Sequence, residues 1–167
     1  MAQESLRRAQ MIDVSLIGPP YRLSNKSKEV LATVHPDLQK VVRRAIEITQ
    51  QDFTVFEGIR TLERQQKLVN QGVSKTLNSK HLTGRAVDLV PYVEGKLDFN
   101  DWEKFYPIAE AMQQASKELK IPIRWGGTWQ PLNQGNKPLK ELREEYIKQR
   151  RAQGKRVFLD APHFELI

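Results

Sequence analysis

A single carboxylate inside an apolar run constrains this chain more than any other feature. The run Ala86–Val90 has the composition of a buried strand, and Asp88 lies in its middle. A carboxylate buried without a partner is strongly destabilising or loses its charge, so a cation, a network of donors or a metal ion must lie beside it. His81 lies in a polar turn seven residues earlier.

A second carboxylate and a second histidine, Asp160 and His163, occur together near the end of the sequence. Catalytic zinc typically has three protein ligands from His, Asp, Glu or Cys and keeps a fourth position for water. His81, Asp88 and His163 would provide such a set, and Asp160 would remain as a base. The residues alone leave an alternative open, in which both histidines are hydrogen-bonded structural residues and Asp88 pairs with an arginine.

Four short blocks extend this pattern over most of the chain. In order, they are EGIRT (57–61), SKHLTGRAVD (79–88), RWGGTW (124–129) and DAPH (160–163). Together they resemble the zinc peptidases grouped with D-alanyl-D-alanine peptidases and hedgehog-type domains, and within that group the L-alanyl-D-glutamate endopeptidases that phages use as endolysins. The resemblance spans about residues 28–167, but it includes neither the first 25 or so residues nor the segment between Trp129 and Phe158.

The resemblance implies a role for each polar residue in these blocks. His81, Asp88 and His163 would hold zinc, Asp160 would be the catalytic base, and Arg60 would be the cation that faces the scissile carbonyl. The implied activity is hydrolysis of the L-alanyl-D-glutamate bond in peptidoglycan stem peptides, which would lyse the cell wall. A D-alanyl-D-alanine carboxypeptidase is the first alternative, and a non-enzymatic basic binding module with structural zinc is the second.

Three further residues are candidates for contact with the substrate: Ser79, Trp125 and Trp129. For the two tryptophans, packing in the core is an equally good interpretation. Arg60 also has a simpler alternative, a salt bridge at the surface, although its place at the end of a strand beside Gly58 suits a functional cation. His35 precedes a proline, so we interpret it as a helix-start residue and not as a metal ligand.

Hydrophobic periodicity predicts a mixture of helices and strands. Together with the resemblance, it implies an α+β fold, with a small antiparallel sheet that carries the zinc site and packs against helices in a single domain. We divide the chain into an N-terminal arm (1–25) and a peptidase domain (26–167) with a basic helical insertion at about 130–156. Thr61 and Asn100 are the predicted N-caps of two helices. The predicted helices are 27–34, 36–48, 62–70, 100–119 and 137–153, and the predicted strands are 52–59, 86–92, 121–127, 157–159 and 164–167.

A net charge of +7 and an isoelectric point near 9.7 indicate an anionic partner. Residues 137–156 hold eight Lys or Arg against three Glu, which makes this segment a candidate anchor to anionic wall or outer-membrane polymers, although a basic helix is usually only a solvated face. Its candidate residues are Lys140, Arg143, Lys148, Arg150 and Arg151. Peptidoglycan is the expected partner and nucleic acid is not. We expect a monomer, made in the cytoplasm without a signal peptide, that acts on the cell wall.

Overall fold

The computed structural model describes residues 20–167, so most of the arm predicted for residues 1–25 lies outside the described part. One hydrophobic core joins the helices to the sheet. In chain order the elements are α3 (Asn25–Leu31), α4 (Pro36–Ile48), β1 (Phe53–Glu57), α5 (Leu62–Asn70), the 3₁₀ helix η1 (Lys80–Thr83), β2 (Ala86–Val93), β3 (Lys96–Leu97), α6 (Trp102–Leu119), β4 (Ile123–Trp125), α7 (Leu139–Ala152) and β5 (His163–Leu166).

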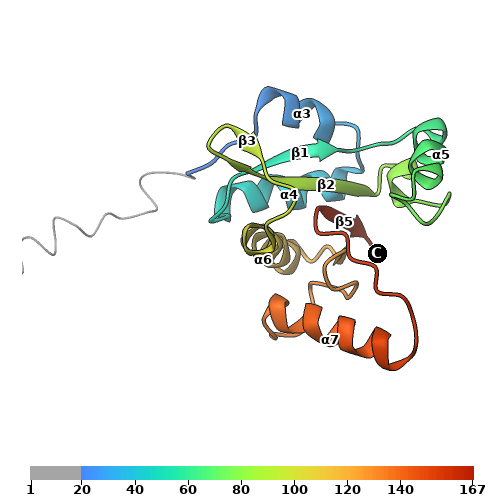
Figure 1. The fold of residues 1–167 in the computed structure, drawn as a ribbon. Coiled ribbons are helices and arrows are strands. Elements are labelled where there is room, and N and C mark those ends of the chain that lie inside the picture. Colours follow the sequence, from blue (N-terminus) through green and yellow to red (C-terminus); the bar gives the residue numbers. More distant parts are fainter. Residues whose placement is uncertain (1–19) are drawn as a thin grey trace, which may run out of the picture.

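The sheet has the strand order β1-β2-β5-β4, every pair is antiparallel, and β3 extends β2 as a short hairpin. Helix α3 packs on β1, whereas α4 packs on α6, and α6 contacts β2 and β4 (Figure 1). The predicted α+β class with a small antiparallel sheet is therefore confirmed. Among the helices of residues 20–167, none is both long enough and apolar enough to span a membrane.

Local sequence signals account for several element boundaries. The Thr61 hydroxyl accepts a hydrogen bond from the Arg64 amide at 3.1 Å and caps α5 as predicted. His35 caps α4, because its Nδ1 accepts from the Asp37 amide at 3.1 Å. The prediction that His35 starts a helix is confirmed.

Two local predictions were wrong. The carboxylate of Asp98 accepts from the amides of Asn100 and Asp101, which holds a turn there, so Asp101 and not Asn100 is the N-cap of α6, which begins at Trp102. The predicted strand 157–159 is irregular. The carbonyl of Phe158 accepts from the side chains of Trp129 and Tyr146, at 2.7 and 3.1 Å, and not from a neighbouring strand.

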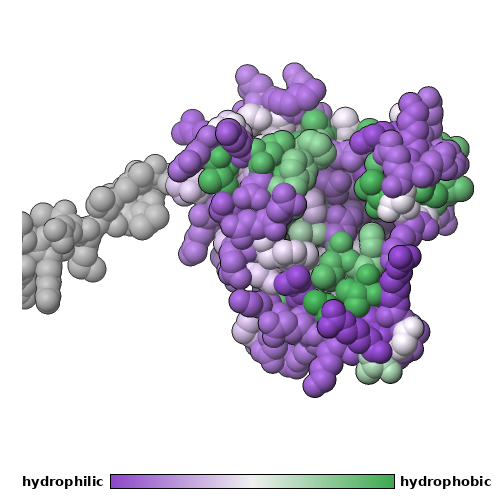
Figure 2. All heavy atoms as spheres, viewed as in Figure 1, coloured by the Kyte–Doolittle hydropathy of each residue, from purple (hydrophilic) through white to green (hydrophobic). Residues whose placement is uncertain are grey.

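The basic helix α7 packs against α6. Leu139 is buried at its start, and the guanidinium of Arg143 lies 3.8 Å above the ring of Trp102 while Nη1 donates to the Tyr106 hydroxyl at 3.1 Å. Figure 2 shows this face of the molecule as mostly hydrophilic, with a patch of apolar side chains between β5 and α7. The helix is thus attached to the domain through its inner side chains, and Arg143 is one of them.

Candidate active site

Strand pairing places Glu57, Asp88 and His163 in one row across the sheet. Glu57 of β1 is opposite Asp88 of β2, and Asp88 is opposite His163 of β5. The register of β1 shifts between Val55 and Glu57, as in a β-bulge, and this shift brings Glu57 into the row. Opposed residues on neighbouring strands lie within direct reach of each other, so sheet register alone brings Glu57, Asp88 and His163 together.

The 3₁₀ helix η1 adds His81 to this row. The Ser79 hydroxyl accepts from the amide of His81 at 3.2 Å, and the carbonyl of His81 accepts from the amide of Arg60 at 2.9 Å. The imidazole Nδ1 donates to the carbonyl of Gly58 at 2.9 Å. Because a carbonyl can only accept, Nδ1 carries the proton and Nε2 presents its lone pair to the interior of the site.

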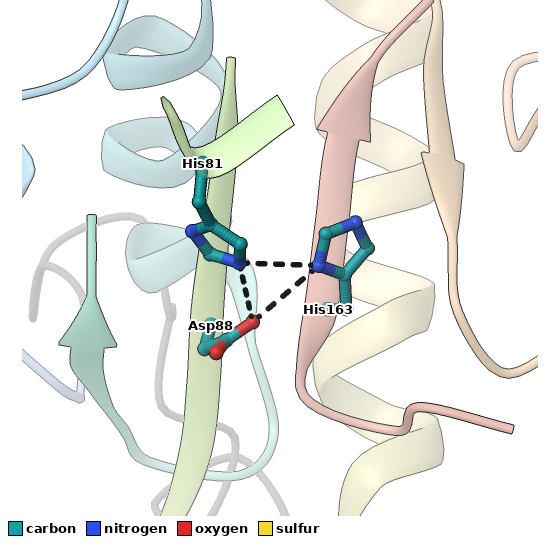
Figure 3. Close-up of side chains that lie close together, drawn as sticks. All are labelled: His81, Asp88 and His163. Carbon is teal, nitrogen blue, oxygen red and sulfur yellow. Dashed lines mark hydrogen bonds and ion pairs between the residues drawn. The ribbon is translucent and has the colours of Figure 1, made fainter. Parts of the chain in front are cut away.

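Three ligand atoms converge here, from η1, β2 and β5 (Figure 3). Nε2 of His81 lies 3.1 Å from Oδ1 of Asp88 and 3.2 Å from Nδ1 of His163, and the latter two atoms are 3.6 Å apart. Tetrahedral zinc with bonds of about 2.0–2.1 Å places its ligand atoms about 3.3 Å from one another. The donor set and its spacing therefore fit a metal ion with three protein ligands.

A carboxylate outside this triangle orients His163. Nε2 of His163 donates to Oε1 of Glu165 at 2.8 Å, which leaves Nδ1 to face the other ligand atoms. Glu165 is itself buried and lies 3.2 Å from the ammonium of Lys80 and 3.6 Å from the guanidinium of Arg124. Such an outer carboxylate fixes the tautomer of a metal-binding histidine and raises its basicity.

The ionisation of these groups follows from their burial and their neighbours. Burial alone would raise the pKa of Asp88. When the imidazoles of His163 and His81 are protonated, their hydrogen bonds and positive charge outweigh burial and hold that pKa well below its usual range. Burial lowers the pKa of His163, yet the carboxylates of Asp88 and Glu165 outweigh it and raise the pKa to about 9. The same carboxylates that favour a proton on His163 would favour a cation in its place.

Arg60 is not a surface salt bridge, because only 8% of its side chain is exposed. It donates from Nε and Nη2 to the carboxylate of Glu57 at 2.8 and 2.7 Å and from Nη1 to Gln65 at 2.7 Å, and Nη2 lies 3.7 Å from Asp88. Three of the five guanidinium N–H groups are thus used by Glu57 and Gln65. Gln65 is fully buried and donates in turn to the carbonyl of Thr76.

Asp160 lies in the turn that leads into β5. The amide of His163 donates to the carbonyl of Asp160, and the amide of Asp160 donates to the carbonyl of Gly126, at 3.1 and 2.9 Å. A Cβ added to Gly126 would lie 2.2 Å from the carbonyl oxygen of Asp160, so only glycine permits this approach. Burial, followed by the negative charge of Asp88, raises the pKa of the Asp160 carboxyl to about 6.

A cleft of about 610 Å³ opens onto these groups. Ser79, Trp129 and Asp160 line it together with Arg60 and the three candidate ligands. Trp125 does not, because its side chain has no exposed surface and its Nε1 donates to the carbonyl of Ala161 within the core. The prediction of a substrate contact is therefore wrong for Trp125, which takes the alternative role of core packing.

The fold and the site define a small α+β domain with a candidate metal centre in a cleft, and comparison with known proteins shows the family to which it belongs. Residues 20–167 match the family described as phage L-alanyl-D-glutamate peptidase, and the chain belongs to that family. The predicted resemblance is confirmed.

Individual relatives agree with this assignment. The chain is 44% identical to the L-alanyl-D-glutamate peptidase of Escherichia phage T5 over 112 residues, which cover 65% of this chain and 82% of that protein. It is 37% identical to the L-alanyl-D-glutamate peptidase of Listeria phage A118 over 75 residues, 45% of this chain and 25% of that protein. The crystal structure of the L-Ala D-Glu endopeptidase ChiX of Serratia marcescens superposes with a TM-score of 0.68 and 33% identity, covering 89% of this chain and 92% of ChiX.

Sequence reasoning missed Glu57, Gln65 and Glu165. For Glu165 a signal was present, since it interrupts an apolar strand as Asp88 does and lies two residues from His163, hence on the same face of β5. Gln65 has no comparable signal, because a glutamine within a polar helix gives no indication that it will be buried.

Proposed function

We propose that this protein is a zinc-dependent endopeptidase that cleaves the L-alanyl-D-glutamate bond in the stem peptides of peptidoglycan and thereby lyses the cell wall. The observation that carries the proposal is the convergence of His81, Asp88 and His163 in the cleft, with Asp160 on its wall. Membership of the phage L-alanyl-D-glutamate peptidase family supports the choice of bond.

The metal would be held by the two imidazoles and the Asp88 carboxylate. A zinc ion bound there would supply a Lewis acid that activates water and polarises the scissile carbonyl. Once a cation displaces the proton on Nδ1 of His163, Gly58 and Glu165 hold the remaining proton of each imidazole on the nitrogen that faces away from the ligand triangle. These fixed tautomers orient both imidazoles toward the cation before any substrate binds.

Asp160 would act as general base and then as general acid. It accepts the proton that the attacking water loses as the new C–O bond forms, and it returns a proton to the nitrogen as the C–N bond breaks. The products are a carboxylate on L-alanine and a free amino group on D-glutamate. Burial raises the pKa of the Asp160 carboxyl, which favours a group that can both accept and return a proton.

Arg60 would stabilise negative charge on the carbonyl oxygen with the N–H groups that Glu57 and Gln65 leave free. The same guanidinium lies beside Asp88, and its positive charge favours the ionised carboxylate. Ser79 and Trp129 line the cleft and would contact the substrate there.

Digestion of purified peptidoglycan, followed by mass spectrometry of the fragments, tests this function. We expect new amino-terminal D-glutamate, which a zinc-selective chelator abolishes and added zinc restores. The Asp160→Asn variant should retain about one zinc per chain but lose about 100-fold to 10,000-fold in turnover, the usual range for a general acid–base group. Release of free D-alanine instead would indicate a D-alanyl-D-alanine carboxypeptidase. If the peptidoglycan stays intact, the remaining interpretation is that the protein is a non-enzymatic binding module.

A further inference from the structure

Lys75 lies at the end of an aromatic wall that leads to the candidate metal ligands. Its ammonium is 4.5 Å from the centre of the Phe158 ring. Phe158 stacks on Trp129 with ring centres 5.7 Å apart and an angle of 17°, and Trp129 lies 5.7 Å from the ring of His163. Lys75, Phe158, Trp129 and His163 all line the cleft, so this wall connects the loop after α5 to the site.

The electrostatic surroundings distinguish Lys75 from the other cations of the cleft. Among residues 20–167, no carboxylate forms an ion pair with Lys75. The other cations that line the cleft each have a carboxylate partner, at 2.7, 3.9 and 3.2 Å: Arg60 and Arg64 with Glu57, and Lys80 with Glu165. The ring of Phe158 holds the ammonium by a cation–π contact, which leaves its N–H groups available to an anion from solution.

The substrate chemistry supplies such an anion. A glutamyl residue that is acylated at its amino group still has two carboxyl groups, and continuation of the peptide uses one of them. The other remains an ionised carboxylate a few bonds from the scissile amide. The cleft already contains four acidic groups that would repel it, namely Glu57, Asp88, Asp160 and Glu165, so a cation without a carboxylate partner is needed nearby.

We propose that Lys75 binds the free carboxylate of the glutamyl residue that follows the scissile bond, an inference that rests on the proposed function. Lys75 selects substrates whose glutamyl carboxylate is free over those in which it is amidated. Phe158 is a positioning residue for Lys75, because its ring places the ammonium on the cleft wall. The contact stabilises the bound substrate and the transition state equally, so its loss raises KM more than it lowers kcat.

A pair of soluble stem peptides tests this inference, one with the glutamyl carboxylate free and one with it converted to a carboxamide. With the free carboxylate, Lys75→Met should raise KM about fivefold to tenfold, as expected for a partly exposed ion pair with a charge-assisted hydrogen bond. The ratio of variant KM to wild-type KM should be clearly larger for the carboxylate peptide than for the carboxamide. Lys75→Arg, which keeps the charge, should restore most of the discrimination.

Lys67→Met is the matched control, because Lys67 is an exposed lysine of the neighbouring helix α5 that pairs with Glu63. Its KM should equal the wild-type KM for both the carboxylate and the carboxamide peptide. Equal effects of Lys75→Met on both peptides would overturn the inference and leave Lys75 as a support for the cleft wall, and no effect on either peptide would overturn it as well. If the wild type cleaves neither peptide while both are intact and zinc is bound, the proposed function itself fails and the inference falls with it.

Discussion

At the scale of single residues, the site depends on side chains that are neither candidate metal ligands nor the candidate base. Glu165 binds His163 on the side opposite the ligand triangle, and Lys80 and Arg124 balance its charge. Gly126 lies directly against Asp160 and has no room for a Cβ. These contacts determine where the chemical groups point, so substitution of such residues should affect the site without removing any ligand or base.

Glu165→Ala should weaken zinc binding about 10-fold to 100-fold, the usual cost of removing an outer partner of a metal ligand. The reason is that His163 loses the acceptor that holds its tautomer. Titration of the apoprotein against a chelator of known zinc affinity measures this directly, without reference to activity. Glu165→Gln keeps an acceptor and should lose less.

Glu110→Ala provides the control for this measurement, because Glu110 is an exposed glutamate on α6. If Glu165→Ala binds zinc as tightly as Glu110→Ala, the orienting role of Glu165 is contradicted. Circular dichroism of the apoproteins separates this effect from unfolding, since removing Glu165 also leaves Lys80 and Arg124 without their shared carboxylate.

At the scale of elements, α7 has one side that packs on α6 and another that is exposed to solvent. Arg143 packs on Trp102, Lys140 lies 3.3 Å from Glu103, and Arg150 donates to the carbonyl of Arg156. These three were part of the five-residue anchor expected from the sequence. The exposed cations at the end of the helix, Lys148 and Arg151, together with Lys155 just beyond it, therefore form a better candidate for contact with an anionic polymer.

Replacing Lys148, Arg151 and Lys155 with glutamine should weaken binding to whole cell walls at low salt, and most of the difference from the wild type should disappear at 1 M salt. The Debye length falls from about 10 Å at 0.1 M to about 3 Å at 1 M, which screens charges on an exposed surface. Cosedimentation with purified walls measures the binding. Cleavage of a short soluble stem peptide should stay within about twofold of wild type, because that substrate requires only the cleft and an exposed charge contributes little elsewhere.

Equal binding of the wild type and this variant at low salt would make the exposed side of α7 an ordinary solvated surface. Arg143→Gln gives the opposite comparison. It removes the contacts with Trp102 and Tyr106 and should lower the stability of the protein. Activity on whole walls and on the soluble peptide should therefore fall together, at low and at high salt.

At the scale of the whole molecule, the candidate metal centre joins segments that are distant in the chain. His81 comes from η1, Asp88 from β2 and His163 from β5, and Arg60 ties the end of β1 to the same point. A ligand that binds only the folded state stabilises it by mass action. The metal should therefore contribute to global stability as well as to catalysis.

Removal of zinc should lower the thermal unfolding midpoint by about 5–10 °C relative to protein held at 100-fold excess of zinc over its Kd. The estimate combines about 2.7 kcal/mol of linkage energy with a shift of about 2–4 °C per kcal/mol for a domain of this size. Scanning calorimetry with and without a chelator measures it. His81→Ala should show little dependence on zinc, whereas an identical midpoint for the wild type in both conditions would argue against metal binding at this site.

The sequence alone was sufficient to predict features that depend on interactions between residues close together in the chain. Three local predictions are confirmed: the cap at Thr61, the start of α4 at His35 and the strand around Asp88. Hydrogen bonds and periodicity within a few residues determine all three. The need of Asp88 for a charged or hydrogen-bonding partner also followed directly, since the cost of burying a carboxylate does not depend on the fold.

Only the tertiary structure could decide how these segments meet. The shifted register of β1 places Glu57 opposite Asp88, and the pairing of β2 with β5 places His163 there as well. Trp125, a candidate for the cleft wall, is instead buried in the core. Such contacts join residues separated by up to about half the chain. Their energy comes from register, packing and desolvation between elements, which no short stretch of sequence encodes.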